Sequence, residues 1–141
     1  MSNLKDFDWT GFWNDVDYAF ESYIGKSVTD KDIKDAEAEL GYTLPAAYIE
    51  LLNNHNGGVL NKNCFINNNG DCVYVTGIYG IDRDKKNSIL GQFGNEFWIS
   101  KWEYPPIGIV VADTISGGHD MIFLDYRECG PTGEPKVVRV D

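Results

Sequence analysis

The sequence predicts a single α+β domain whose helices come before its strands. With 141 residues, 43% of them hydrophobic, the chain is long enough for one domain with a core and too short for two domains of ordinary size. Up to Asn56 the apolar residues recur at helical spacings, and after Gly58 short apolar runs alternate with turn residues. A Rossmann-type fold would instead alternate strands and helices along the whole chain.

An aromatic helix is predicted for residues 1–28. Apolar side chains recur there at spacings of three and four, so that one helix would present them to the core as a stripe: Trp9, Phe12, Trp13, Val16, Phe20, Tyr23 and Ile24. Gly25 is a natural end for this helix.

A pair of helices is predicted for residues 29–58. Thr29 and Asp32 approximate a capping box, and Gly41 ends the helix that they begin. Pro45 opens the next helix, because the first helical turn needs no N–H donor at that position. The apolar side and the end of this helix come from the other residues of the segment: Leu44, Tyr48, Leu51, Leu52, Asn56, Gly57 and Gly58.

Strands and turns are predicted for residues 59–141. The runs VLNKNCFI and CVYVTGIYGI flank residues 67–70, whose side chains tolerate left-handed backbone angles, so a hairpin is expected there. Residues 88–103 are assigned to a short helix and a loop, since two glycines weaken their helical pattern. The runs GIVVAD, DMIFLDY and KVVRVD are the remaining strands, with a hairpin turn at Gly117 and Gly118 between the first two.

The densest group of reactive side chains, in the stretch SGGHDMIFLDYREC, does not predict an active site. Ser116 precedes two glycines that lead into a strand, whereas a nucleophile elbow needs G-x-S-x-G. His119 and Asp120 are neighbours that point to opposite faces of a strand, and Cys129 has no evident base near it. Asp120 and Asp125 differ in parity, so we expect them to bond backbone N–H groups at the strand ends. No catalytic residue, metal ligand or cofactor is therefore predicted.

The charge balance favours a basic protein partner and argues against direct nucleic-acid binding. The chain holds 12 Lys and Arg against 22 Asp and Glu, for a net charge of -10, which is the wrong sign for holding phosphates. Most of this excess lies in the first 40 residues, which hold 10 acidic and 4 basic side chains. Such charge runs usually face water, so we assign them to the solvated faces of the helices.

The N-terminus and the cysteines predict a cytosolic protein with reduced thiols. The start of the chain lacks a basic segment followed by an apolar run, and no window holds about 18 consecutive apolar residues, so no membrane contact is expected. Cys64, Cys72 and Cys129 have no metal-ligand spacing, and their odd number argues against a disulfide framework. A bond between Cys64 and Cys72 across the hairpin is the less favoured alternative. His55 is expected to be a helix cap or a packed core residue.

The segment from Ile81 to Glu103 is the predicted partner-binding surface. Binding a basic partner takes carboxylates for steering and large side chains as anchors, and this segment offers both in Asp82, Asp84, Glu96, Trp98, Trp102 and Glu103. The competing interpretation is that the tryptophans cover the sheet, because aromatic residues at near-helical spacing are usually core. The acidic N-terminal helices are the next candidate for the interface.

Two blocks of motifs, taken in order, resemble the SUKH superfamily. The first block reads Thr29-Asp30-x-Asp32-Ile33, Glu39-Leu40-Gly41, Leu44-Pro45, Tyr48, Leu51-Leu52 and Asn56-Gly57-Gly58, and the second reads Gly118-x-Asp120-Met121-Ile122-x-Leu124-Asp125. The resemblance runs from about residue 29 to the end of the sequence. The superfamily takes in fungal cell-wall synthesis regulators and many bacterial proteins, and the C-terminal block is similar to one bacterial subgroup.

The resemblance implies a helix-first α+β domain with a curved, mostly antiparallel sheet and no catalytic machinery. For a bacterial member it implies an immunity protein that neutralises a polymorphic toxin, often a nuclease, and the acidic balance fits because a nuclease must be basic to hold phosphates. The alternative is a regulatory or scaffold domain that binds a host signalling or cell-wall factor. Members usually continue into a C-terminal helix, whereas this sequence ends at Asp141. One sheet face is therefore expected to be thinner, or covered by the N-terminal helix or by a partner.

Overall fold

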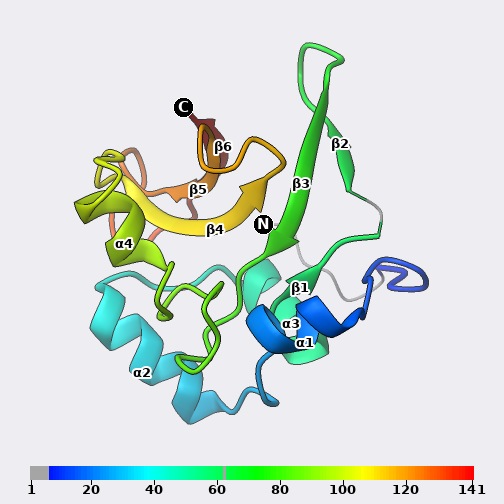
Figure 1. Ribbon diagram of the computed structural model, residues 1–141. Helices are drawn as coiled ribbons and strands as arrows, with labels where there is room; N and C mark the ends of the chain where they lie inside the picture. Colours follow the sequence, from blue (N-terminus) through cyan, green and yellow to red (C-terminus); the bar gives the residue numbers. More distant parts are fainter. Residues whose placement is uncertain (1–6, 62) are drawn as a thin grey trace.

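Three helices precede the strands in the computed structural model, which describes residues 7–61 and 63–141 (Figure 1). The elements are, in order, α1 (Asp17–Ser22), α2 (Asp30–Leu40), α3 (Ala46–Asn54), β1 (Gly58–Val59), β2 (Cys64–Ile66), β3 (Cys72–Ile78), α4 (Asn95–Ser100), β4 (Gly108–Thr114), β5 (Met121–Asp125) and β6 (Lys136–Val140). This order confirms the predicted α+β fold class. Among the described residues, no helix combines the length and the hydrophobicity that crossing a membrane requires.

The strands form an antiparallel sheet in the order β1, β3, β4, β5 and β6, and β2 pairs with β3 as well. The C-terminal end of β3 pairs with β1 and its N-terminal end pairs with β2. The register shifts between Val75 and Gly77 in β3 and between Val110 and Ala112 in β4. Irregularities of this kind bend a strand and increase its twist, and Figure 1 shows the resulting curvature of β4. The curved antiparallel sheet implied by the resemblance is thus confirmed.

The signals around α2 and α3 have the effects predicted for them. The Thr29 hydroxyl accepts the N–H of Asp32 at 3.1 Å, and the Thr29 N–H is donated to the Asp32 carboxylate at 2.9 Å, which completes the capping box. Gly41 ends α2 in the left-handed region, with a φ of 82°. Pro45 is the N-cap of α3 and so lies just outside the helix. Both predicted helices are confirmed.

The prediction of one aromatic helix over residues 1–28 is wrong within the described part of that range, where the helix is limited to α1. Gly11 has a φ of 68°, which no α-helix contains, and Trp13 forms a β-bridge with the residue after β1. Phe20, a member of the predicted stripe, is 52% exposed. Several of these aromatic residues therefore lie in a turn that packs against β1. Helical periodicity in the sequence cannot predict such a contact. Residues 1–6 of the prediction lie outside the described residues.

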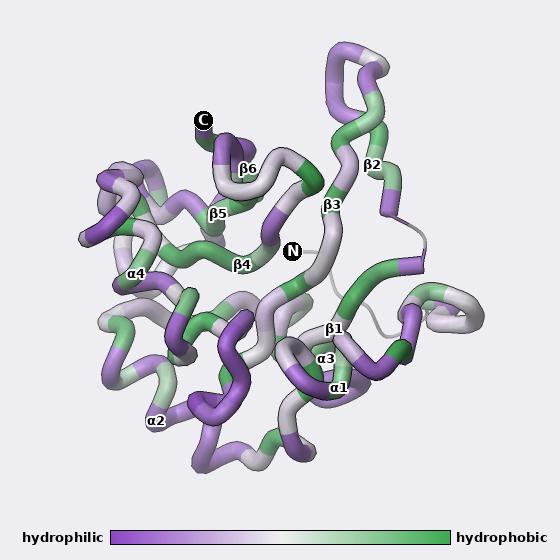
Figure 2. The backbone as a smooth tube through the Cα atoms, in the orientation of Figure 1, coloured by the Kyte–Doolittle hydropathy of each residue, from purple (hydrophilic) through white to green (hydrophobic). Residues whose placement is uncertain are grey.

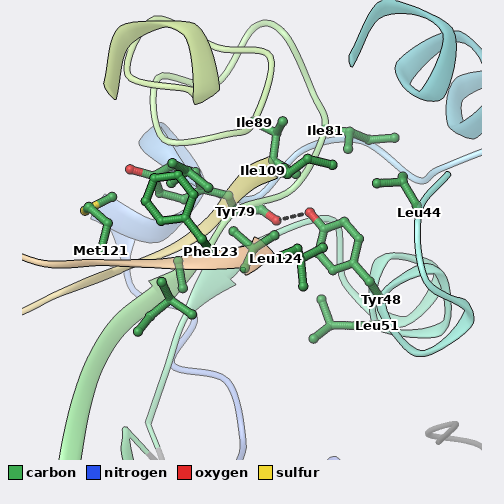
Figure 3. Close-up of a cluster of buried hydrophobic side chains, with 14 of the residues drawn as sticks. Leu44, Tyr48, Leu51, Tyr79, Ile81, Ile89, Ile109, Met121, Phe123 and Leu124 are labelled. Atoms are coloured by element: carbon green, nitrogen blue, oxygen red, sulfur yellow. Dashed lines mark hydrogen bonds between the residues drawn. The ribbon is translucent and has the colours of Figure 1, made fainter. Parts of the chain in front are cut away.

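The helical pair packs onto the sheet through α3 (Figure 3). Tyr48 is buried, and its hydroxyl donates a hydrogen bond to the backbone carbonyl oxygen of Tyr79, just after β3. Burial raises the pKa of the Tyr48 hydroxyl far above its usual value, so the hydroxyl keeps the proton that it donates. Leu44 and Phe123 are buried in the same cluster. This bond helps to fix the direction in which the chain leaves β3, and the segment that follows lines the candidate site.

A hairpin made of β2, the start of β3 and their loop projects beyond the rest of the sheet, because β4 pairs with β3 only from Val75 onward (Figure 1). We call residues 63–75 the arm. The structure joins Cys64 and Cys72 of the arm by a disulfide, with their Cα atoms 5.5 Å apart, so the expectation of reduced thiols is wrong for this pair. The hairpin register places both residues on one face at a distance that a disulfide can bridge, and a cysteine count cannot reveal that relation. Cys129 is a free thiol.

Candidate partner-binding surface

The residues predicted to bind a partner do not form one cluster. Asp82 and Asp84 line a groove between α2 and the segment after β3. Glu96 lies in α4, while Trp102 and Glu103 follow that helix and are exposed. The sixth predicted residue, in the middle of α4, is Trp98, which is only 8% exposed and offers little surface to a partner.

The groove that contains Asp82 and Asp84, here named the acidic groove, has a volume of about 330 Å³. Its two walls, α2 and the segment after β3, contribute five carboxylates, from Asp32, Asp35, Glu39, Asp82 and Asp84. Lys26 and Arg83 also line it, and the Arg83 guanidinium lies 2.5 Å from the Glu39 carboxylate. The sequence predicts the second wall through Asp82 and Asp84, whereas the acids of α2 are assigned to the solvated helix faces and enter only with the acidic N-terminal helices as the next candidate interface. The charge excess of the first 40 residues was the signal that could have found them.

Asn56 ties the walls of the acidic groove to each other. Its side-chain nitrogen donates to the carbonyl oxygen of Lys26 at 2.8 Å, and its side-chain oxygen accepts the N–H of Ile81 at 2.9 Å. Its backbone carbonyl oxygen accepts the N–H of Gly25 at 2.9 Å. Because one buried residue bonds to the segment before α2 and to the segment after β3, the two walls have a fixed relation.

The glycines after Asn56 are required by close packing under this groove. Gly57 has a φ of 84°, and a Cβ there would lie 2.6 Å both from the backbone nitrogen of Gly80 and from the carbonyl oxygen of Tyr23. Only glycine meets both conditions without strain. At Gly58, a Cβ would lie 2.7 Å from a ring carbon of Trp13. The Asn56-Gly57-Gly58 turn is therefore a packing unit beneath the acidic groove.

A second acidic surface surrounds the end of α4. Trp102 is 45% exposed, and its ring centroid lies 5.0 Å from that of Trp98, on which it rests. Glu103 has a φ of 59° and is the one non-glycine residue with a positive φ in the described part of the chain. Gly118 lies under the indole, since a Cβ there would be 2.9 Å from the Trp102 ring. Trp98 is buried, as the interpretation in which the tryptophans cover the sheet predicts, whereas Trp102 keeps nearly half of its surface exposed.

The β4–β5 turn holds its reactive side chains in a local hydrogen-bond network. Gly117 and Gly118 have φ angles of 72° and 103°. The Asp120 carboxylate accepts the hydroxyl of Thr114 at 2.6 Å, and the Asp120 N–H is donated to the Ser116 hydroxyl oxygen at 2.9 Å. Burial raises the pKa of Asp120, but hydrogen bonds from Ser116 and Thr114, together with the nearby charge of Arg139, outweigh it and hold the pKa below its usual value. The expectation that the Asp120 side chain bonds a backbone N–H was wrong, because two hydroxyl groups lie nearer.

Asp125 is the last residue of β5, and hydrogen bonds from Arg127 hold its carboxylate in the ionised form. Its carboxylate accepts the backbone N–H of Arg127 at 3.0 Å, as expected at a strand end, and both a 3.0 Å and a 2.8 Å bond from the Arg127 guanidinium. These bonds lower the pKa of Asp125 to about 2. The Cys129 thiol, four residues on, points to the carbonyl oxygen of Gly130 at 3.2 Å.

His55 is the C-cap residue of α3, and its ring stacks on that of Trp13 with centroids 4.2 Å apart. Its Nε2 atom lies 3.1 Å from the Asp15 carboxylate. His119 is exposed in the β4–β5 turn. Over residues 7–61 and 63–141, no three side chains of His, Cys, Asp or Glu are grouped so that they could hold a metal ion.

A further groove, which the sequence analysis missed, lies on the sheet face that carries Ile122 and Leu124 and has a volume of about 580 Å³. We name it the apolar groove. It is lined by α3, the arm and β4 to β6. Its rim includes Phe65, Ile66 and Val137, which are 41%, 69% and 71% exposed. The signal for it was the run of adjacent apolar residues in CFI and KVVRV, which puts apolar side chains on both faces of a strand. The N-terminal helix α1 packs against β1 and does not line this groove.

The family of the chain follows from a comparison with family models. Residues 27–141 match the model of the SMI1 / KNR4 family (SUKH-1). The matched range contains α2, α3, α4 and all of the described strands, and it confirms the resemblance to the SUKH superfamily. No curated protein and no solved structure matches the chain.

Proposed function

We propose that this chain, which belongs to the SMI1/KNR4 family, is a non-enzymatic immunity protein that neutralises a cognate toxin by protein–protein contact. The toxin we propose is a basic domain of the nuclease type. Membership of the family is consistent with immunity and with regulatory roles, so the choice between them rests on the surface of this chain.

The observation that carries the proposal is the gathering of five carboxylates on two facing walls of the acidic groove. A nuclease holds the phosphates of its substrate with Lys and Arg side chains, and this requires a basic surface. A groove with an excess of carboxylates offers that surface the same charge as a phosphate backbone. The net charge of -10 extends the attraction beyond contact distance and raises the association rate.

Trp102 supplies the apolar anchor that the acidic groove lacks. Binding energy concentrates in a few aromatic side chains near the centre of an interface, and the Trp102 ring is exposed while Trp98 supports it from below. Exposed carboxylates of Glu96 and Glu103 lie close to it along the chain. Because α2 and α4 lie on the same side of the view in Figure 1, with the segment after β3 between them, we propose that the toxin spans both surfaces.

The test combines binding and activity. A candidate toxin domain is taken from a gene that neighbours the gene of this chain and is purified. Its association with the chain is measured by surface plasmon resonance at two ionic strengths, followed by a toxin activity assay. The double substitution Asp35→Lys and Asp84→Lys is expected to slow association by about ten-fold and to weaken its salt dependence. Both residues are exposed, and the ion pair that Asp35 makes with Lys31 is an exposed one that contributes little to folding.

The matched control reverses two exposed acids outside the acidic groove, Glu21→Lys and Glu128→Lys, and changes the net charge by the same amount. It is expected to slow association much less. If the control and the groove variant slow association equally, only net charge matters and the groove is not the contact. If the groove variant binds at the wild-type rate, the interface lies elsewhere.

The competing function is regulatory or scaffold binding of a host signalling or cell-wall factor, with which the same family membership is consistent. The pull-down of a neighbouring toxin domain distinguishes the two functions. Capture of the toxin together with loss of its activity supports immunity, and a toxin that stays active in the presence of the chain supports the regulatory function.

A further inference from the structure

The apolar groove and the arm have no part in the proposed contact with a toxin. Among the residues that the structure describes, the charged side chains that line the groove are one acid and one base, Glu134 and Arg139, so this lining is close to neutral on a strongly acidic chain. Its rim exposes Ile66 at 69% and Val137 at 71%. Large apolar side chains exposed around an apolar groove mark a surface that another molecule covers.

The arm carries the same kind of surface beyond the edge of the sheet. Phe65, Ile66 and Tyr74 are 41%, 69% and 48% exposed, and Asp71 is the one charged residue in the sequence of the arm. Figure 2 shows hydrophobic stretches on both of its strands below a hydrophilic tip. A two-stranded hairpin gains little stability by itself, and apolar side chains along an exposed strand are a template for contact with another chain.

We propose that two copies of this chain associate through this face, with the arm of each copy lying in the apolar groove of the other. One face supplies both the arm and the groove, so the contact is self-complementary and closes as a two-fold dimer. The charges select this face for self-association. Two chains that each carry -10 repel one another, but contact through this face brings together few like charges, since the charged side chains among the described residues of the arm and of the groove lining are Asp71, Glu134 and Arg139.

A basic toxin is the poorer match for this face. Its Lys and Arg side chains would lose water against apolar residues without a cluster of carboxylates to replace it, and unpaired charges are costly to desolvate. The two grooves thus serve two different partners: the acidic groove takes the basic protein, and the apolar groove takes the arm of a second copy.

Sedimentation velocity of the purified chain over a wide range of concentrations tests the proposal, with dimerisation expected for the wild type. Ile66→Asp and Val137→Asp each place a carboxylate at the rim of the apolar groove, and each is expected to raise the dimer dissociation constant by about ten-fold or more. The matched control is Ile115→Asp, because Ile115 is also 69% exposed but lies in the β4–β5 turn and does not line the groove. It is expected to leave the constant unchanged, and thermal melts verify that all three variants fold.

A wild-type chain that stays monomeric at every concentration overturns the proposal. A dimer that both rim variants leave intact also overturns the proposal, because the contact then uses another face. The proposal is overturned as well if Ile115→Asp weakens the dimer as much as the rim variants do. Toxin binding is measured with the same variants: if the rim variants lose it and Ile115→Asp keeps it, the groove belongs to the toxin. Sedimentation uses the chain alone, so its outcome does not depend on the proposed function.

Discussion

The acidic groove and the apolar groove belong to one small domain but differ in charge and in construction. Within the described part of the chain, five carboxylates and two basic side chains line the first, and one charge of each sign lines the second. The walls of the acidic groove are joined by Asn56 and rest on the tightly packed Gly57. One wall of the apolar groove is the arm, which leaves the sheet and is held by the disulfide within its own hairpin.

The difference shows how one acidic chain can present two surfaces that do not compete. A charged groove acts before contact, sets the association rate and weakens with salt. An apolar groove acts only on contact, through the area that it removes from water, at roughly 25 cal/mol per Å². Under the two proposals, a partner selected by one of these effects gains little from the other surface, and this difference would separate the two occupants.

The largest loss of folding stability is expected from replacing a glycine beneath the acidic groove, and a glycine of the arm provides the comparison. Gly57 beneath the acidic groove and Gly70 at the tip of the arm both have a φ of 84°. A Cβ at Gly57 would meet backbone atoms at 2.6 Å, whereas a Cβ at Gly70 would have nothing within 4 Å. Gly57→Val is expected to destabilise the fold by about 4 kcal/mol, from left-handed strain plus overlap, and Gly70→Val by about 1 to 2 kcal/mol from strain alone.

Urea unfolding and thermal melts of the two glycine variants measure this difference. Equal losses would mean that close packing beneath the acidic groove contributes nothing to its rigidity. Melts unchanged from the wild type for both would contradict the strain argument as well.

A half-buried carboxylate of β4, in contrast to the exposed Asp35 and Asp84 of the acidic groove, is expected to produce the next largest effect. Asp113 of β4 accepts a hydrogen bond from the Tyr23 hydroxyl at 2.5 Å and another from the Gly77 N–H at 3.0 Å. Burial raises the pKa of Asp113 from 3.8 to about 6, against the effect of these bonds. Since the folded-state pKa exceeds the unfolded value, protonation favours the fold. This stabilisation is fully present below the unfolded value of 3.8 and is lost as the pH rises through about 6.

Asp113→Asn is expected to remove that pH dependence, because an amide cannot ionise and the Tyr23 hydroxyl can accept as well as donate. The wild type should become more stable by about 2 kcal/mol between neutral pH and about pH 4.5, and the variant should not. Asp125 has the opposite sign: its pKa of about 2 means that its stabilisation is present above 3.8 and lost as the pH falls toward 2. Urea unfolding against pH checks both statements, and a rise that survives in Asp113→Asn would assign the titration to another group.

The smallest effect is expected for the reactive residues that neither groove contains. The triple variant Ser116→Ala, His119→Ala and Cys129→Ala should keep both toxin neutralisation and self-association. Its stability should fall by about 1 kcal/mol, because the Ser116 hydroxyl accepts the N–H of Asp120. Lost neutralisation in a variant with a native circular dichroism spectrum, and with a melt lowered by no more than this loss of stability, would reopen the question of an active site in this turn.

Local signals were enough to predict most elements of the fold and only part of the candidate site. The capping box at Thr29, the proline before α3 and the Asn-rich turn of the arm each act within a few residues, so the sequence places them correctly. The N-terminal aromatic residues were misassigned because Trp13 pairs with Leu60, a contact across 47 positions that outweighs helical periodicity. For the same reason, the sequence treats the acids of α2 and those after β3 as separate candidate surfaces, whereas the structure places them in one groove.

The sequence by itself determined the order of helices and strands, the acidic character of the chain and the motifs that assign its family, because these depend on local spacing and on composition. Only the tertiary structure decided that Trp98 is buried while Trp102 is exposed, that Cys64 reaches Cys72, and that the acids of two distant segments face one another. The physical reason is that each of these facts depends on distances between side chains from separate segments. Such distances are set by how the whole core packs, and no short window of sequence contains them.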